Sequence, residues 1–336
     1  MAESLREIPS GFDSFQRRSA TPTAREWRLH GTLFLLTVVS TIIAGTLLAA
    51  PAPPISEPPL RTISDYILYI PLSYIYSIVA YFKLALLHPQ LIANGATFSA
   101  SLLAILFSHE MGHYLACRYY GVDATMPYFI PAPPMFLAGT FGAFIKIRSP
   151  IPTRRALFDI GLAGPLAGFV VALPITLVGL WTMGEPIPQQ SAGIFFNDPL
   201  LFRLMARVLG VRLDPNSPIN PYYMAAWIGL LVTSLNLMPV GQLDGGHGTF
   251  AVFGQKAHRV IGRVAFVSVA VLAVLGFWWH GSPSGFLFTI LLGIMMRVRH
   301  PAPPVMEPLG TKRVVIAMLT LLVFVLSCAP FPITIK

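Results

Sequence analysis

The sequence has few charged residues. Lysine and arginine number 23 and aspartate and glutamate 14, so charged residues make up 11% of the 336 residues, against about 25% in an average soluble domain. Hydrophobic residues reach 54%, and the mean hydropathy is +0.67. A water-soluble fold of this length could not bury that much apolar surface. The composition therefore excludes a soluble enzyme and a disordered chain, and it predicts an integral membrane protein in contact with lipids.

Cysteine is also scarce, and the basic residues form no cluster. Cys117 and Cys328 lie far apart in apolar segments, so no disulfide framework is predicted. The net charge is +9, but the basic residues are scattered between apolar runs rather than gathered into a patch. Nucleic acid is therefore not an expected partner.

Several apolar segments approach the roughly 20 residues that a helix needs to cross a bilayer. They predict an all-α, polytopic membrane protein of about seven transmembrane helices. The candidate spans are Gly31–Ala50, Gly95–Cys117, Asp159–Trp181, Tyr222–Leu243, Val260–Trp279, Phe286–Met296 and Val314–Pro330.

The basic residues predict an orientation for these spans. With a cytosolic N-terminus, the inside segments hold 17 of the 23 basic residues and the outside segments hold six, which is the positive-inside pattern. This count treats Tyr66–Leu87 as an interfacial segment on the outer surface, since Pro71, Lys83 and several tyrosines suit an interface. The alternative is that Tyr66–Leu87 crosses the bilayer, which would invert every later segment.

One candidate span ends in the pattern His109-Glu110-x-x-His113. Residues four apart lie on one face of a helix, so both imidazoles can bind one Zn²⁺ ion. Glu110 would lie beside the metal, where a carboxylate can take a proton from a water that zinc activates. Three ionisable residues inside a span are costly unless they have a function.

Asp244 is the candidate third ligand. The segment NLMPVGQLDGGH (236–247) is expected to end a span at Asp244. The alternative interpretation is an ordinary helix C-terminus, where glycine is common. An acid at a helix C-terminus opposes the helix dipole and needs a partner such as a metal ion. Asp159, in contrast, is interpreted as a favourable charge at a helix N-terminus. His247 could contact a zinc ligand or lie in a solvated loop.

The segment TFGAFIKI, Thr140–Ile147, alternates between apolar and other residues. A period of two predicts a strand or a hairpin, and the alternative is an interfacial loop. An exposed strand edge could pair with an unwound substrate. The candidate substrate-binding residues are Gly139, Thr140, Phe141 and Gly142. Gly164 and Gly168 form a Gly-x-x-x-Gly pattern, which is interpreted as close helix packing.

Three motifs together resemble the site-2 protease family of intramembrane zinc metalloproteases. They are HEMGH, GLAGPLAGF and NLMPVGQLDGG, and the resemblance covers about Gly95 to His247. It implies that His109, His113 and Asp244 bind one Zn²⁺ ion, that Glu110 is the catalytic base, and that Asn236 holds the substrate or the oxyanion. Many members carry a PDZ domain, for which Gly184–Pro221 is too short, so a PDZ-less type is expected.

The resemblance implies a three-helix catalytic core with a small membrane-associated strand. The expected parts are a cytosolic N-terminal tail (1–30), the first span with an outer interfacial segment (31–94), the catalytic core spans (95–247) and the C-terminal spans (248–336).

The expected function is hydrolysis of peptide bonds inside or at the edge of the bilayer. The expected partners are a transmembrane protein substrate and membrane lipids, in a bacterial inner membrane with the N-terminus in the cytosol; no oligomeric state is predicted. Two alternatives remain. A zinc transporter would need a path of polar residues through the membrane, and a membrane peptidase for soluble or lipidated peptides would need a large chamber.

Overall fold

The computed structural model describes residues 23–50, 63–133, 136–184, 194–214, 217–218, 220–298 and 302–335. Most of the expected N-terminal tail lies outside the described residues. The helices are α1 (Ala24–Ala49), α2 (Ile63–Leu87), α3 (Pro89–Tyr119), α4 (Arg154–Trp181), α5 (Leu200–Leu209), α6 (Pro221–Asn236), α7 (Asp244–His280), α8 (Ser284–Met295) and α9 (Thr311–Ser327).

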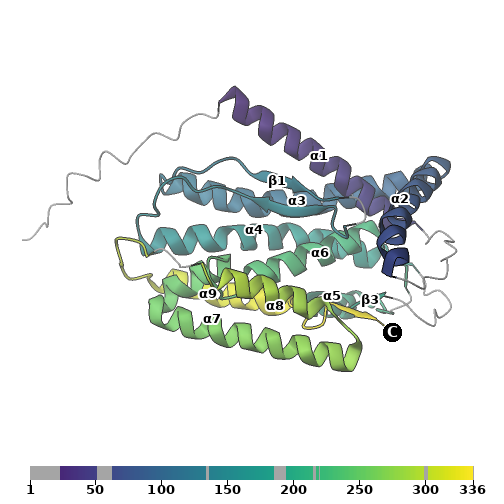
Figure 1. Ribbon diagram of the computed structural model, residues 1–336. Helices are drawn as coiled ribbons and strands as arrows, with labels where there is room; N and C mark the ends of the chain where they lie inside the picture. Colours follow the sequence, from purple (N-terminus) through teal and green to yellow (C-terminus); the bar gives the residue numbers. More distant parts are fainter. Residues whose placement is uncertain are drawn as a thin grey trace, which may run out of the picture.

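Three helices form the centre of the molecule. Helices α3 and α4 pack along each other, and α6 contacts both (Figure 1). Large side chains of these three helices, such as Phe98, Phe158 and Trp227, are fully buried. Helix α1 covers α3 on one side, and α7 packs against α4 on the other. The predicted three-helix core therefore corresponds to α3, α4 and α6, with the start of α7 beside it.

Two short antiparallel sheets accompany the helices. Strand β1 (Tyr128–Pro131) pairs with β2 (Thr140–Phe144), with Phe129 opposite Ala143, and this hairpin lies against α1. An isolated bridge between Ala124 and Ile147 continues the pairing beyond β2. The second sheet joins β3 (Ile194–Phe196) to β4 (Ile333–Ile335). The strand predicted within Thr140–Ile147 is therefore present, and the interfacial-loop alternative is wrong.

Four helices among the described residues are long and apolar enough to cross a membrane: α1, α3, α4 and α7. The predicted count of seven spans is not confirmed. The clearest difference is at Tyr222–Leu243, where α6 has only 16 residues and ends at Asn236. Pro239 has no N–H for a helical hydrogen bond, and Gly241 adopts a left-handed φ of 55°, so the apolar run continues as a loop.

The outer face of α7 is suited to lipid. Five valines that recur every three or four residues are each more than half exposed: Val260, Val264, Val267, Val271 and Val274. Such a stripe on one face of a long helix would be unstable in water. Its exposure supports the prediction of an integral membrane protein.

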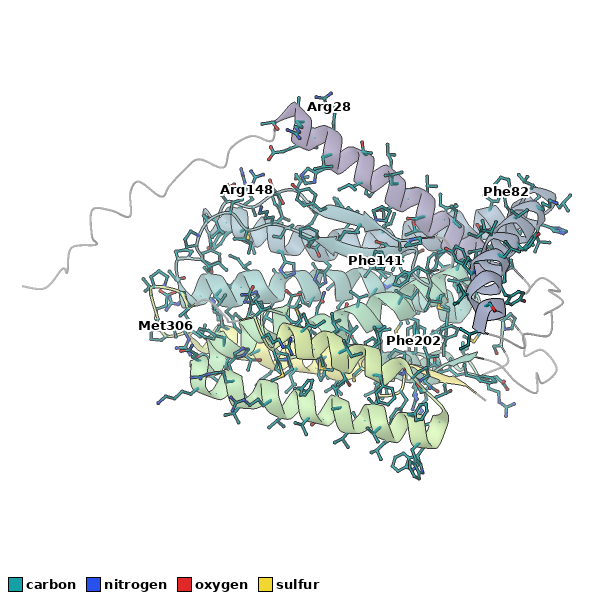
Figure 2. The ribbon with its side chains drawn as sticks, in the orientation of Figure 1. Arg28, Phe82, Phe141, Arg148, Phe202 and Met306 are labelled. Atoms are coloured by element: carbon teal, nitrogen blue, oxygen red, sulfur yellow. The ribbon has the colours of Figure 1, made fainter. Side chains whose placement is uncertain are left out.

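Helix α2 lies at the end of the bundle where α1 ends and α3 begins (Figure 1). Pro71 lies inside this helix, and the part Pro71–Leu87 is apolar but has fewer than the 18 residues required of the four spans. Phe82 marks this end in Figure 2, whereas Arg148 lies at the opposite end, where it pairs with Glu26 at the start of α1. The interfacial placement of Tyr66–Leu87 stays a prediction.

The sequence predicted that Asp159 begins a helix, and this prediction was wrong. Helix α4 already begins at Arg154, and the Thr153 side chain caps it by accepting a hydrogen bond from the Ala156 backbone N–H. Asp159 instead accepts hydrogen bonds from the guanidinium of Arg313, at 2.9 Å from Nε and 2.6 Å from one terminal nitrogen. A carboxylate inside a span is stable when it is paired in this way, and the pair fixes the start of α9 to α4.

Candidate metal centre

Helix α3 places its two histidines on one buried face. His109 is 4% exposed, His113 8% and Glu110 7%. Their spacing of four residues places the two imidazoles side by side on that face, with ring centroids 4.9 Å apart and ring planes at 67°. Both rings face the centre of the bundle, where α4 and the beginning of α7 lie.

Three ligand atoms converge at this point. The Nε2 atoms of His109 and His113 are 3.2 Å apart, and Oδ2 of Asp244 lies 3.2 Å from the first and 3.3 Å from the second. Zinc binds nitrogen and carboxylate oxygen at about 2.0–2.1 Å, so corners of a zinc tetrahedron are roughly 3.3–3.4 Å apart. The three atoms therefore form one face of a tetrahedron of the size that zinc requires, and the fourth corner is left for water or substrate.

A backbone carbonyl sets the tautomer of His113. Its Nδ1 lies 2.6 Å from the carbonyl oxygen of Ile160, so Nδ1–H donates this hydrogen bond. The lone pair of Nε2 then points at the other two ligand atoms. Histidine ligands of metals characteristically donate their second N–H to a carbonyl or carboxylate, so this contact fits a metal ligand.

Gly164 and Gly168 make room for the two imidazoles. A Cβ atom on Gly164 would lie 2.1 Å from Nε2 of His113, and one on Gly168 would lie 3.2 Å from Cβ of His109. The Gly-x-x-x-Gly pattern thus packs α4 against α3, as interpreted from the sequence. Its more specific role is to leave space for the two histidines, with Gly164 against His113 and Gly168 against His109.

Gly164→Ala should therefore weaken zinc binding. The added methyl group would overlap the His113 ring, which the Ile160 carbonyl holds from the other edge, so Nε2 must leave its position. We expect zinc affinity to fall by at least the roughly 10–100-fold that follows loss of a group that orients a ligand, together with catalytic activity. Zinc content after dialysis against a graded chelator series measures this.

Gly31→Ala is the matched control, because Gly31 is also helical and a Cβ there would contact nothing within 4 Å. It should keep zinc. Normal zinc affinity in Gly164→Ala would show that the close approach of α4 to His113 has no role in the metal site.

Asp244 lies at the beginning of a helix rather than at the end of one. The sequence predicted that it closes a span, but α6 ends at Asn236 and Asp244 is the first residue of α7. A carboxylate at a helix N-terminus is favoured by the dipole, so the expected conflict with the dipole was wrong. The loop between the two helices is closely packed: a Cβ on Gly245 would lie 1.9 Å from the Leu237 carbonyl oxygen.

Arg154 holds the other end of this first part of α7. Its guanidinium donates hydrogen bonds to the carbonyl oxygens of Ala251 and, at 2.9 Å, of Val252. These carbonyls precede Gly254, whose φ of 78° interrupts the helix. A cation at a helix C-terminus is favourable. Arg154 therefore fixes the short helical segment that begins with Asp244 to α4.

A cleft of about 270 Å³ opens beside the ligand atoms. Its walls include Glu110, Asn236 and His247, together with the end of β2 and the residues that follow it. The Asn236 side-chain nitrogen lies 3.3 Å from Nε2 of His109, and Ile145 lines the cleft together with Glu110. His247 thus lines the cleft beside Asp244 rather than lying in a solvated loop.

The four candidate substrate-binding residues lie outside this cleft. Gly139 packs against the α1 backbone, where a Cβ would lie 2.5 Å from the Ser40 carbonyl oxygen, and the Thr140 hydroxyl donates to the Ile130 carbonyl at 2.7 Å. Phe141 is 59% exposed, and Gly142 pairs with Ile130 at a φ of 102°. The cleft is lined instead by residues further along the predicted strand, which are Ala143, Phe144, Ile145 and Ile147.

Comparison with known proteins gives a consistent result. The sequence profile described as peptidase family M50 matches residues 97–276, which include every residue of the metal centre. Among relatives, the protein named probable zinc metalloprotease EGY2, chloroplastic, from Arabidopsis thaliana is 29% identical over 72% of this chain and 43% of its own length. The similarly named EGY1 proteins are 33% identical in Arabidopsis thaliana (68% of this chain, 41% of theirs) and 37% in Oryza sativa subsp. japonica (52% and 31%).

The chain spans less than half the length of these relatives. No solved structure matches. The profile covers more than half of this chain and includes the three motifs that suggested the resemblance. The chain therefore belongs to peptidase family M50, the family of the site-2 proteases.

Proposed function

We propose that this chain is an intramembrane zinc metalloprotease that hydrolyses peptide bonds within or near the transmembrane segments of membrane proteins. The observation that carries the proposal is the triangle of ligand atoms from His109, His113 and Asp244 beside Glu110, on a helix long and apolar enough to cross a bilayer. The relatives, which are named probable zinc metalloproteases, support it.

The ligand set fits zinc, and the neighbouring side chains fit peptide hydrolysis. His109, His113 and Asp244 would hold a zinc ion, which when bound would act as a Lewis acid that lowers the pKa of water to about 7 and polarises a carbonyl group. Glu110 takes a proton from the attacking water at its carboxylate and delivers it to the leaving amide nitrogen. The Asn236 side-chain amide can donate a hydrogen bond to the carbonyl oxygen as negative charge develops there.

The end of β2 is the proposed substrate-binding edge. Successive residues of a strand direct their N–H and C=O groups to opposite edges. The backbone of Lys146 bonds to Thr125 on the β1 side, so Ala143 and Ile145 direct their backbone groups to the other edge, toward the cleft. A substrate that has lost its helix can pair there, and its scissile carbonyl would then pass beside Glu110.

Ala143→Pro should impair cleavage without loss of zinc. Proline removes an N–H that faces away from β1, so the hairpin can persist while substrate pairing loses one hydrogen bond. We expect kcat/KM to fall about tenfold or more, given roughly 1–3 kcal/mol for a polar group left without its partner. Cleavage kinetics and zinc analysis on one preparation measure both effects.

Ala143→Ser is the control, because it keeps the backbone N–H. It should cleave within about twofold of the wild-type rate, since a substitution that removes no packing or hydrogen bond changes the free energy by about 0.5 kcal/mol or less. Unchanged kinetics in Ala143→Pro would contradict substrate pairing at this edge.

We further propose that the end of the bundle nearest the metal centre faces the side rich in basic loops. The surplus of basic residues at that end supports this orientation. His113 lies six residues before Tyr119, the last residue of α3, so the cut should fall roughly 9 Å from that surface. The relatives are named as chloroplastic, so they lend no support to a bacterial inner membrane.

Reconstitution of the full chain in liposomes tests the function against its alternatives. The expected result is cleavage of a single-span substrate inside its apolar segment, located by mass spectrometry of the products, with little cleavage of a soluble peptide of the same sequence context. Preferential cleavage of the soluble peptide would favour a peptidase for soluble or lipidated peptides. Zinc flux into the liposomes without cleavage would favour a transporter.

A further inference from the structure

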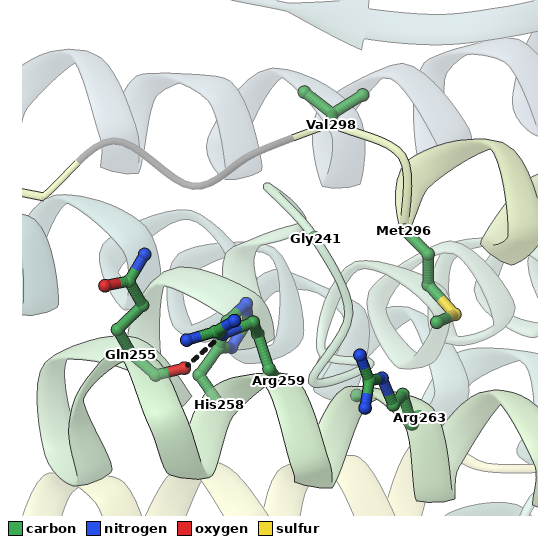
Figure 3. Close-up of a pocket in the computed structure, with 8 residues that line it drawn as sticks. Gly241, Gln255, His258, Arg259, Arg263, Met296 and Val298 are labelled. Atoms are coloured by element: carbon green, nitrogen blue, oxygen red, sulfur yellow. Dashed lines mark hydrogen bonds between the residues drawn. The ribbon is translucent and has the colours of Figure 1, made fainter.

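A second pocket, of about 220 Å³, is lined in part by Gly241, which belongs to the loop that leads to Asp244 (Figure 3). Its floor is α7 just beyond the Gly254 kink, and its walls are Gly241 and the chain that leaves α8 at Met296. Nothing in the proposed hydrolysis uses this pocket. Its lining differs from that of the metal centre because the charged side chains in it are basic.

Arg259 and Arg263 dominate the pocket. They lie one helical turn apart on α7, and both line the pocket. In Figure 3 the Arg259 guanidinium lies beside Gln255, and Arg263 lies on the Met296 side of the loop that carries Gly241. Within the described part of the chain, neither guanidinium pairs with a carboxylate, and Arg259 Nε makes only a 3.5 Å contact to the Gln255 carbonyl oxygen. No acidic residue lines the pocket among the residues described.

Three other arginines at this end of the bundle pair with carboxylates, whereas Arg28 and Arg154 donate only to backbone carbonyl oxygens among the described residues. Arg148 pairs with Glu26, Arg155 with Glu307 and Arg313 with Asp159. The two guanidinium groups in the pocket have no carboxylate partner among the described residues, and both line the same concave space. Planar guanidinium groups bind phosphate oxygens in pairs, and the pocket has room for one phosphate group with water.

The pocket lies at one end of the exposed apolar face of α7. The exposed valine stripe that faces lipid begins at Val260, beside Arg259. Basic pockets between helices at the edge of the apolar layer bind anionic headgroups. We propose that Arg259 and Arg263 form a binding site for a phosphate group, supplied either by an anionic phospholipid or by free phosphate.

The bound group would touch the loop that positions a metal ligand. Gly241 forms one wall, and its backbone is tightly enclosed: a Cβ there would lie 2.3 Å from the Met295 carbonyl oxygen, and one on Gly246 would lie 2.5 Å from the Gly241 carbonyl oxygen. Gly246 is two residues from Asp244. Occupancy of the pocket would therefore brace α8 and the loop at the point where the metal ligand begins α7.

Native mass spectrometry of the full chain in detergent tests the site. The lipid probe is dioleoyl-phosphatidylglycerol, and dioleoyl-phosphatidylcholine is the zwitterionic reference. A separate thermal-unfolding experiment compares inorganic phosphate with chloride at equal ionic strength. The double variant Arg259→Gln with Arg263→Gln should bind phosphatidylglycerol about thirtyfold more weakly, since each basic residue near a membrane surface contributes roughly a fivefold factor. Each single variant should show about fivefold weakening, which tests the site if the double variant folds poorly.

The control is Arg25→Gln with Arg28→Gln, which removes the same charge from the same end of the bundle on the exposed start of α1. Selective loss of phosphatidylglycerol binding in the pocket variant assigns the site to a lipid. Selective loss of stabilisation by inorganic phosphate assigns it to the free ion. Unchanged affinity for both probes, or equal weakening in the control, would overturn the proposal.

Discussion

Glu110→Gln is expected to abolish peptide hydrolysis while zinc stays bound. The amide has the shape of the carboxylate but cannot accept a proton from water, whereas the three ligand atoms of His109, His113 and Asp244 are unchanged. General-base catalysis contributes about 10²–10⁴-fold, so the rate should fall by about three orders of magnitude. Single-turnover cleavage of a fluorogenic transmembrane peptide, with zinc analysis of the same sample, measures both quantities.

Glu307→Gln is the matched control for this variant. Glu307 pairs with Arg155 at 3.9 Å, on a surface away from the cleft, so its loss should leave cleavage within about twofold because exposed pairs contribute little. A Glu110→Gln protein that holds one zinc ion per chain and still cleaves at more than a few per cent of the wild-type rate would remove Glu110 from the mechanism.

Asp244→Ala should lose the metal itself. The substitution leaves two imidazoles, and a catalytic zinc site needs three protein ligands. Because loss of a group that merely orients a ligand already costs about 10–100-fold in affinity, loss of the ligand should cost more. Cleavage should disappear with the metal and return only in part at high zinc concentration. Competition with a chromophoric chelator gives the affinity.

Asp123→Ala is the corresponding control, because the structure shows Asp123 contacting its neighbours through its backbone N–H and C=O. It should retain wild-type zinc affinity. If Asp244→Ala bound zinc as tightly as this control, the third ligand would have to be sought elsewhere in the cleft, with His247 the nearest candidate.

The sequence predicted the metal centre better than the path of the chain around it. The spacing of His109 and His113 is a local property of one helix, so their shared face follows directly from the helical repeat. Asp244 was predicted as a ligand, but its place in the fold was not. The end of α6 depends on Pro239 and Gly241 and on how the loop packs against α7 and α8, which no periodicity in the sequence records.

Local sequence patterns also failed to predict the number of spans and which strand residues line the cleft. Hydropathy marks Tyr222–Leu243 as one apolar run, although its last seven residues, 237–243, form a loop rather than a helix in lipid. The alternation in Thr140–Ile147 correctly predicted a strand. Which part of that strand reaches Glu110 was decided by the packing of Gly139 on α1, a contact between residues about 100 positions apart.

Removal and return of the metal test the central claim most directly. The full chain, reconstituted and shown to cleave a transmembrane peptide, is depleted of metal with a chelator and then titrated with Zn²⁺ while cleavage and bound zinc are followed together. The account predicts that cleavage falls to the level of Glu110→Gln and recovers in proportion to zinc, complete at one ion per chain. Undiminished cleavage by the metal-free chain would contradict it.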